Sequence, residues 1–299
     1  MFEKFFIVQD IAKTLVKNDY KISFCSGCFD IAARKKEKFL LKVLVNIDAF
    51  SRGHSLSLKA ISYFLSAIPI IISLKNGRDK LRDEVIYSRF DLDVLTPNTF
   101  KKMVNEEIYP SFSSRGKHVV KIFCEKLRER RRELNYSLNE LSKLANISKK
   151  ALYEIENGRV LPKEETAKRL EKILKTKLIV PFNPSEPKKV FIEPKEKVEK
   201  EISNKLFDLG IENTAVFFAP FNLIGKEKFP IITKSFEKIK EIKVDAERIE
   251  KLSSIFSSLT LYVAKREVKE KIEYPIISKN ELLEIFSSKE LLEKIERKI

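Results

Sequence analysis

The residues best suited to chemistry stand at the ends of two short helices predicted around a tight turn. Ser137 caps the first helix, because Glu140 follows three residues later and completes a capping box. Asn146 suits the turn, since asparagine tolerates a positive φ angle. Ser148 then caps a second helix, which Gly158 ends. Two short helices joined in this way pack at a steep angle, so the second can enter the DNA major groove with its first residues against the bases.

Four helices must position these residues. The spacing of the apolar side chains predicts them at Lys117–Leu134, Leu138–Ala145, Lys149–Asn157 and Glu164–Leu174. The apolar residues expected in their core include Leu141, Ile147, Leu152 and Ile155. The polar residues of the third helix are then left to face outward.

The charge of the chain favours a polyanionic partner. Lysine and arginine number 59 against 43 aspartate and glutamate residues, for a formal net charge of +16. Such a field attracts polyanions over a long range, so we expect nucleic acid. An anionic membrane surface, or no polyanionic partner, are the alternatives. No run of 18 apolar residues exists and the first residues lack the layout of a signal peptide, so we expect a cytoplasmic protein that does not span a membrane.

Residues 117–176 resemble the Cro/lambda-repressor class of helix-turn-helix, the xenobiotic-response-element family. The likeness rests on Ser137, on Leu141-Ser142 and on the run from Asn146 to Gly158, which ends in Ile-Glu-Asn-Gly. The resemblance implies a DNA-binding domain. It also implies an ion pair between Arg131 and Glu156, which would join the first and third helices.

The resemblance further assigns DNA contacts. The recognition helix, capped by Ser148, carries the positions that read bases, namely Lys149, Lys150, Tyr153 and Glu154. The positions that grip phosphate are Ser137, Asn157 and Arg159. Lysine can donate to guanine O6 and N7, and glutamate can accept from cytosine N4. A half-buried Tyr153 is the alternative for that residue. Leu138 departs from the family, since many relatives have a glutamine there, so fewer contacts are expected from its helix.

Residues 1–104 predict an α/β domain with the order α-β-β-β-α-β. The apolar stripe of its first helix is assigned to Phe5, Phe6, Ile11, Leu15 and Val16. The order resembles the restriction-endonuclease-like fold, whose nucleases carry an aspartate and then an acidic-x-lysine triplet on the next strand. Asp30 and Lys42 match two of these positions, but Leu40 replaces the second carboxylate. The substitutes that no spacing singles out are Glu3, Glu37 and Asp48.

Three interpretations of this domain stay open. It is a degenerate, non-catalytic nuclease fold, or an active metal-dependent nuclease, or Asp30 is a turn residue and Lys42 a surface lysine. A hard cation held by Asp30 alone would bind weakly, so we expect no metal, no cofactor and no enzyme activity. Cys25 and Cys28 form a single CxxC, short of the four ligands of a structural zinc site, so free thiols are expected, with a redox or metal role as the alternative.

Runs rich in proline, serine and charge predict two linkers. The expected organisation is an α/β domain at 1–104, a linker at 105–116, a helix-turn-helix domain at 117–180, a linker at 181–203 and an α/β domain at 204–299. The last domain is expected to repeat the second half of the first, with Thr214–Ala219 matched to Leu41–Ile47. The alternative is that α/β domains share similar helix-to-strand joints for physical reasons alone.

The whole arrangement resembles a family of archaeal helix-turn-helix regulators. We therefore predict a multidomain, sequence-specific DNA-binding transcriptional regulator. A single domain of this kind makes few contacts, so a homodimer on a palindromic duplex site is expected. A metal-dependent nuclease with a targeting domain, and a non-enzymatic adaptor that recruits transcription machinery or RNA, are the alternatives. The sequence indicates neither the operator, nor the direction of regulation, nor a small-molecule effector.

Overall fold

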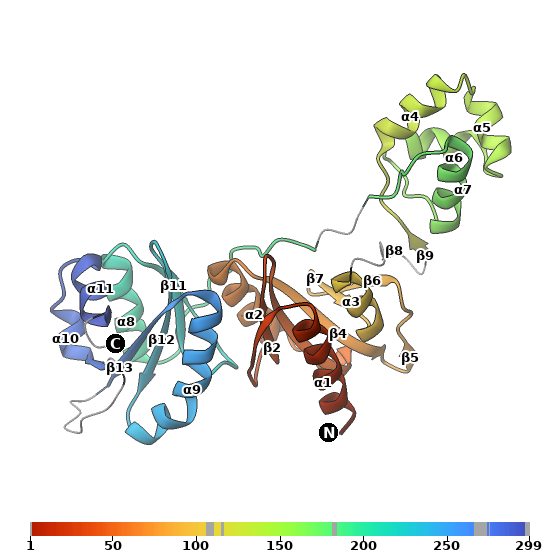
Figure 1. Cartoon of the computed structure of the whole chain (residues 1–299). Coiled ribbons are helices and arrows are strands. Elements are labelled where there is room, and N and C mark those ends of the chain that lie inside the picture. The colour runs from red at the N-terminus through yellow and green to blue at the C-terminus, as the bar shows by residue number, and fades with distance from the viewer. Residues whose placement is uncertain are drawn as a thin grey trace. The chain divides into compact units, whose positions relative to one another are not determined.

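The computed structural model describes residues 2–105, 111–114, 117–180, 184–265, 274 and 276–296 (Figure 1). Two compact units are present, formed by residues 1–78, 90–92 and 185–299, and by residues 79–89 and 93–184. The sequence led us to expect separate N-terminal and C-terminal domains, whereas the structure joins most of both in the first unit. None of the helices within the described ranges is long and apolar enough to cross a membrane.

The N-terminal part of the first unit has the predicted order of elements. Its elements are α1 (Phe2–Lys17), β1 (Lys21–Phe24), β2 (Ile31–Arg34), β3 (Lys38–Asn46), the 3-10 turn η1 (Ile47–Ala49), α2 (Arg52–Leu65) and β4 (Ile68–Asn76). Strands β1, β2 and β3 pair antiparallel, and β3 pairs parallel with β4. A parallel pair needs a crossover connection, and α2 supplies it. Burial of most of β3 and β4 explains their almost continuous apolar sequence.

The apolar stripe predicted for α1 is partly wrong. Ile7, Ile11 and Leu15 face the core, since residues four apart lie on one side of a helix. Phe5 and Phe6 lie on other sides and are 58% and 66% exposed. Val16 is also exposed. The sequence shows two apolar faces on this helix, and only the packing against the sheet selects one of them.

The C-terminal part of the first unit is a second α/β layer structure. Its elements are α8 (Lys197–Asp208), β10 (Glu212–Ala215), β11 (Leu223–Lys226), β12 (Pro230–Phe236), α9 (Ile239–Phe256), β13 (Leu259–Ala264), β14 (Ile276–Ser278), α10 (Lys279–Leu283) and α11 (Ser288–Glu296). The strands follow the order β10-β11-β12-β13-β14. The core between helices and sheet includes Ile202, Leu206, Leu223, Leu261 and Val263.

Two boundaries and one strand pairing in this region differ from the prediction. Helix α8 begins at Lys197, inside the linker predicted at 181–203, because Ile202 and Leu206 pack it onto the sheet. Residues 181–183 of that linker lie outside the described part of the chain. The strand predicted at Thr214–Ala219 ends at Ala215, and it pairs as the first strand of its sheet rather than as a counterpart of Leu41–Ile47.

The second unit begins with short strands and continues into helices. Its first elements are β5 (Asp79–Lys80), β6 (Val85–Arg89), β7 (Leu92–Leu95, whose first residue belongs to the first unit), α3 (Pro97–Val104), β8 (Ser111–Ser114) and β9 (Lys117–Val119). Strand β8 lies inside the linker predicted at 105–116, since it pairs with both β6 and β9. Residues 106–110 and 115–116 of that linker lie outside the described ranges.

The helix predicted at Lys117–Leu134 is shorter than expected. Strand β9 takes its first residues, and α4 (Cys124–Glu133) begins only after an irregular connection. The backbone N–H of Val120 donates to the carbonyl of Pro162 at 3.0 Å, which holds this connection in an extended form. Val120 and Ile122 are buried, so their apolar character reflects packing of an extended segment rather than a helical stripe.

Candidate nucleic-acid interface

Four helices form the central region: α4, α5 (Leu138–Leu144), α6 (Lys149–Glu156) and α7 (Glu164–Leu174). The sequence predicted α7 with its exact bounds, and α5 and α6 to within one residue at their C-terminal ends. Their shared core includes Leu127, Leu141, Leu152, Ile155 and Leu170. The expected core residue Ile147 is half-buried at its edge. This packing turns the opposite side of α6 to solvent.

The predicted caps are confirmed. Ser137 Oγ accepts from the Glu140 N–H at 3.1 Å, and the Glu140 carboxylate accepts from the Ser137 N–H at 2.8 Å. These hydrogen bonds hold the pKa of the Glu140 carboxyl below its usual value. Asn146 has a φ of 53° in the turn. Ser148 Oγ accepts from the Ala151 N–H at 3.0 Å, so α6 begins at the predicted residue.

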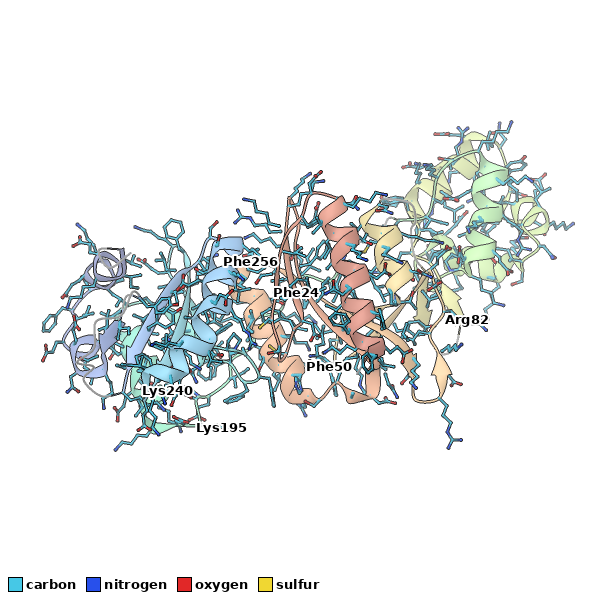
Figure 2. The ribbon with its side chains drawn as sticks, turned by 60° about the horizontal axis from the view of Figure 1, so that its bottom comes forward. Phe24, Phe50, Arg82, Lys195, Lys240 and Phe256 are labelled. Atoms are coloured by element: carbon cyan, nitrogen blue, oxygen red, sulfur yellow. The ribbon has the colours of Figure 1, made fainter. Side chains whose placement is uncertain are left out.

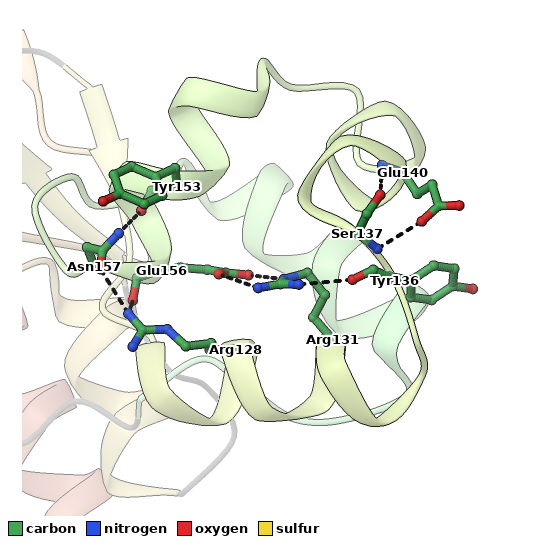
Figure 3. A network of polar contacts seen from close by, with 8 residues as sticks. All are labelled: Arg128, Arg131, Tyr136, Ser137, Glu140, Tyr153, Glu156 and Asn157. Carbon is green, nitrogen blue, oxygen red and sulfur yellow. Dashed lines mark hydrogen bonds and ion pairs between the residues drawn. The ribbon is translucent and has the colours of Figure 1, made fainter.

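A buried ion pair joins α4 to α6 (Figure 3). Arg131 donates from Nε and Nη2 to the two carboxylate oxygens of Glu156, at 2.6 and 3.1 Å. Its Nη1 donates to the carbonyl oxygen of Tyr136 at 2.9 Å. The Glu156 side chain is 3% exposed, so both charges depend on this paired geometry. The ion pair that the family resemblance implied is present.

Arg128 adds a second tie between the same helices, which sequence reasoning missed. It donates to the Glu156 carbonyl at 3.0 Å and to Asn157 Oδ1 at 2.9 Å (Figure 3). Asn157 in turn donates from its amide nitrogen to the Tyr153 carbonyl at 2.7 Å. These contacts cap the end of α6 and orient the Asn157 side chain. The only signal in the sequence was an arginine one turn before Arg131.

The predicted base-reading residues lie on the exposed side of α6 and around its ends. Lys149 and Lys150 are exposed in its first turn. Tyr153 is 45% exposed, so the alternative that it is half-buried is wrong. Glu154 pairs with Arg159 at 3.6 Å, and the Arg159 guanidinium lies 5.9 Å from the centre of the Tyr153 ring. The structure thus gathers Tyr153, Glu154 and Arg159 into one cluster, while their contacts with DNA stay a prediction.

Ser137 and Asn157 bracket this surface, at the start of α5 and the end of α6. Both are exposed, and both side chains already hold hydrogen bonds within the protein. The Ser137 and Ser148 hydroxyls accept hydrogen bonds as helix caps, and their contacts with DNA stay a prediction. Leu138 is half-buried against the core, as its apolar side chain requires.

The nuclease-like position in the first unit holds a different network. Asp30 is 7% exposed, and its carboxylate accepts from Lys4 Nζ at 2.7 Å and from the Val43 N–H at 2.8 Å. Lys42 Nζ lies 3.3 Å from the same carboxylate and also donates to the Gly27 carbonyl. Burial lowers the pKa of Lys42, while Asp30 acts in the opposite direction. Asp30 and Lys42 therefore form a buried ion pair, which excludes a surface position for Lys42.

These residues do not fit a divalent metal ion. One carboxylate is present, and two ammonium groups already neutralise it. Leu40, at the position of the second carboxylate, is fully buried and has no ligand atom. The proposed substitutes Glu3, Glu37 and Asp48 are exposed, and no group of three or more histidine, cysteine or carboxylate side chains with metal-binding geometry occurs among the described residues.

The cysteines of the CxxC sequence lie beside this network. Burial raises the pKa of the Cys25 thiol to about 11, and it raises the pKa of Cys28 still further. Both are free thiols, as is Cys124. Thiols with raised pKa values are poor nucleophiles and poor metal ligands at neutral pH.

Comparison with known proteins places two of these regions in families. Residues 5–110 match the PD-(D/E)XK superfamily domain, the class of fold that the order of elements resembled. Residues 127–179 match a helix-turn-helix domain. The expected combination of a nuclease-like α/β domain, a helical DNA-binding region and a C-terminal sheet is confirmed.

Relatives similar to the whole chain occur in archaea. A protein of Methanothermobacter thermautotrophicus is 32% identical over 98% of this chain and 96% of its own length. One of Pyrococcus horikoshii is 33% identical over 96% and 95%. One of Archaeoglobus fulgidus is 28% identical over 98% and 97%. Each is named "Putative HTH-type transcriptional regulatory protein". No solved structure matches the chain.

Proposed function

The chain belongs to a family of archaeal HTH-type transcriptional regulatory proteins, and from this we propose that it regulates transcription by binding a specific duplex DNA sequence through α6. The observation that carries the proposal is the two-sided character of α6. Leu152, Ile155 and Glu156 are buried against the other helices, whereas Lys149 and Lys150 are exposed in the first turn. A helix held in this way can enter the major groove with its N-terminal residues toward the base edges.

Each exposed residue then has a stated role. Lys149 and Lys150 donate to guanine O6 and N7, and Glu154 accepts from cytosine N4. Arg159 is held beside Glu154 and over Tyr153, so it can reach phosphate while the glutamate reads the base. Asn157 is oriented by Arg128 and supplies its second amide hydrogen to phosphate.

The oligomer and the partner follow from the same proposal. One helix-turn-helix reads only a short half-site, so two copies of the chain bind a palindromic duplex with half-sites about one helical turn apart. The exposed basic residues increase the association rate with DNA at low salt. The protein acts in the cytoplasm, as a regulator without enzymatic activity.

The test begins with selection of bound duplexes from a random pool by the full-length protein. The selected duplexes give the sequence of the binding site and its symmetry. A site that consists of a single, asymmetric half-site would contradict the dimer. Affinity for that site is then measured by fluorescence anisotropy. Lys149→Ala/Lys150→Ala should weaken binding by about 30-fold or more, because each of the two base contacts contributes about 1–3 kcal/mol.

The matched control is Lys172→Ala/Lys177→Ala. It removes the same charge from exposed lysines that lie outside α6, at the end of α7 and just beyond it. Binding should stay within about threefold of the unaltered protein. Equal losses for both pairs would mean that the lysines act through general charge, and the assignment of α6 as the reading helix would be abandoned.

A nuclease is the second candidate, because residues 5–110 match the PD-(D/E)XK superfamily. Lys4 and Lys42 on the single carboxylate of Asp30 favour a domain that does not hydrolyse DNA. Incubation of the selected duplex with Mg²⁺ or Mn²⁺ tests this. Cleavage that disappears in Asp30→Ala would establish the nuclease and overturn the non-enzymatic proposal.

A further inference from the structure

The two α/β parts of the first unit share more than their order of elements, because their strands pair in the same register. In β2 and β3, Ile31 lies opposite Leu41 and Arg34 opposite Lys38. In β11 and β12, Leu223 lies opposite Thr233 and Lys226 opposite Pro230. The hairpins are therefore closed by loops of equal length, residues 35–37 and 227–229. The parallel pairs also correspond, with Phe39 opposite Ile68 and Ile231 opposite Leu259.

The crossover helices end in the same way. A left-handed serine follows each helix as its C-cap, Ser66 after α2 with a φ of 51° and Ser257 after α9 with a φ of 55°. In each case the N–H of the residue after the serine donates to a carbonyl oxygen in the last turn of the helix. Ala67 donates to Ser62, and Ser258 donates to Ser253. Left-handed serines are uncommon, so the shared ending is more specific than a general α/β joint.

The same positions around the nuclease-like site are polar in both parts. The Asp30 N–H donates to Leu41 O and its carboxylate accepts from the Val43 N–H. The Asn222 N–H donates to Thr233 O and its side-chain oxygen accepts from the Ser235 N–H at 3.0 Å. Asn222 therefore stands where Asp30 stands, between the same two strands.

The two lysines that pair with Asp30 also have counterparts in the C-terminal part. Lys4, the third residue of α1, donates to Asp30, and Glu199, the third residue of α8, accepts from the Asn222 amide at 2.7 Å. Lys42 immediately precedes Val43, and Lys234 immediately precedes Ser235. Lys234 pairs with Asp245 of α9 at 2.8 Å.

The chemistry of the two positions is reversed. In the N-terminal part the helix supplies a cation and the loop a carboxylate, whereas in the C-terminal part the helix supplies a carboxylate and the loop an amide. Leu40 and Ile232, each two residues before the lysine, are both fully buried and apolar. Each position thus keeps a paired polar centre but lacks the second carboxylate that would hold a metal.

Contacts between the two parts are reciprocal. The Phe217 N–H donates to Ser57 of α2 at 3.0 Å, and Arg248 of α9 donates to Ser26 at 3.4 Å. Helix α2 contacts β11, and α9 contacts β2 and β1. Figure 2 labels Phe256 at the end of α9 and Phe24 at the end of β1, on the elements that meet.

The loops before β2 and β11 meet each other. The Cys28 N–H donates to the Phe218 carbonyl at 2.6 Å, and Gly27 and Phe218 both have positive φ angles, of 135° and 58°. A Cβ on Gly27 would come within 1.9 Å of the Phe218 oxygen, so only glycine fits there. Mutual contact of corresponding loops, together with reciprocal helix contacts, is the mark of an isologous, twofold interface.

We propose that the segment from α8 to β14 is a second, diverged copy of the PD-(D/E)XK-type domain, with its former metal position at Glu199, Asn222 and Lys234, and that the two copies form a dimer within one chain. Within the first unit, the surfaces through which two copies of the domain pair are already in contact with each other. Two chains that bind a palindromic site must therefore associate through a different surface.

The probe is Mn²⁺, used with the full-length protein. Asn222→Asp/Ile232→Glu would place three carboxylates, together with Glu199, at the former metal position. Thermal unfolding with MnCl2 at about 100 times its dissociation constant should raise the melting temperature of this variant by roughly 5 °C. Electron paramagnetic resonance should detect one bound Mn²⁺ per chain. The unaltered protein should show neither effect.

The control is Asn222→Asp/Ile231→Glu, because neighbouring residues of a strand point to opposite faces. It has the same composition and should not respond to Mn²⁺. A folded Ile232 variant that binds no Mn²⁺, or an equal response of both variants, would overturn the assignment of the second site.

If the Ile232 variant fails to fold even with Mn²⁺, an exchange of charges at the second site tests the proposal instead. Glu199→Lys with Asn222→Asp gives the second site the composition of the first. Each single change should lower the melting temperature, and the double variant should recover it to within a few degrees of the unaltered protein. A double variant no more stable than the single ones would overturn the proposal.

Discussion

The helix-turn-helix and the nuclease-like domain each bury a carboxylate against cations, but the two networks serve different ends. Glu156 is held by one arginine that bridges α4 and α6, and this bridge fixes the exposed side of the proposed reading helix. Asp30 is held by two lysines, at the position where the resemblance to nucleases implies a metal ligand. The same kind of ion pair therefore supports an exposed surface in one region and occupies the nuclease-like position in the other.

The largest effect is expected from Arg131→Ala. It leaves the Glu156 carboxylate, 3% exposed, without its partner, and it leaves the Tyr136 carbonyl without a donor. The free energy of unfolding of the second unit should fall by about 3–5 kcal/mol, measured by urea denaturation. Specific DNA binding should be lost with it.

The control for this variant is Glu133→Ala, which removes the exposed Arg130–Glu133 pair on the same helix. Its cost should stay below about 0.5 kcal/mol. Similar costs for Arg131→Ala and Glu133→Ala would mean that the Arg131 bridge does not hold α6 in place.

Asp30→Asn should cost less, about 2 kcal/mol near pH 7, because Lys42 can lose its proton instead of remaining a buried charge. Burial already lowers the pKa of Lys42, so the folded state binds fewer protons there than the unfolded state, and stability rises with pH toward the ordinary lysine value. Removal of Asp30 lowers that pKa further. The deficit of the variant should therefore be greatest near neutral pH and shrink toward pH 10.

Urea denaturation of Asp30→Asn at several pH values measures this change. Asp91→Asn is the matched control, because the exposed Asp91 meets Lys59 at 3.5 Å and asparagine tolerates its φ of 57°. The control should show no pH-dependent deficit. A deficit of Asp30→Asn that is independent of pH would place its cost in lost hydrogen bonds rather than in the charge of Lys42.

Ser148→Ala should cost about 1 kcal/mol, because the Ala151 N–H loses its acceptor at the start of α6. Ser137→Ala should cost a similar amount at the start of α5. The comparison separates stability from recognition. Both variants should unfold at similarly reduced urea concentrations, while the DNA affinity should fall more for Ser148→Ala, since α6 is the proposed reading helix.

The smallest effect on stability is expected from Glu154→Gln. The pair with Arg159 is long and its arginine is exposed, so the free energy of unfolding should change by less than about 0.5 kcal/mol. Repeating the selection with this variant should relax the base preference at one position of each half-site. An unchanged consensus would remove Glu154 from the reading residues.

Local signals determined the helix-turn-helix. Ser137, Ser148 and Asn146 act within three or four residues of themselves, so the sequence by itself determined the caps and the turn. The Arg131–Glu156 pair came from the family resemblance rather than from spacing. The start of α4 was misjudged, because Val120 is buried by a contact with Pro162 that no local pattern records.

The flanking domains show which features the sequence alone does not determine. Their order of elements could be predicted from periodicity, and Asp30 and Lys42 from resemblance. Only the tertiary structure decided that Lys4 is the second partner of Asp30, that α1 buries Ile7 and Ile11 rather than Phe5 and Phe6, and that Asn222 stands in the place of Asp30. Each of these depends on strand register and on contacts between distant segments. A sequence pattern that repeats every two or four residues carries no information about either.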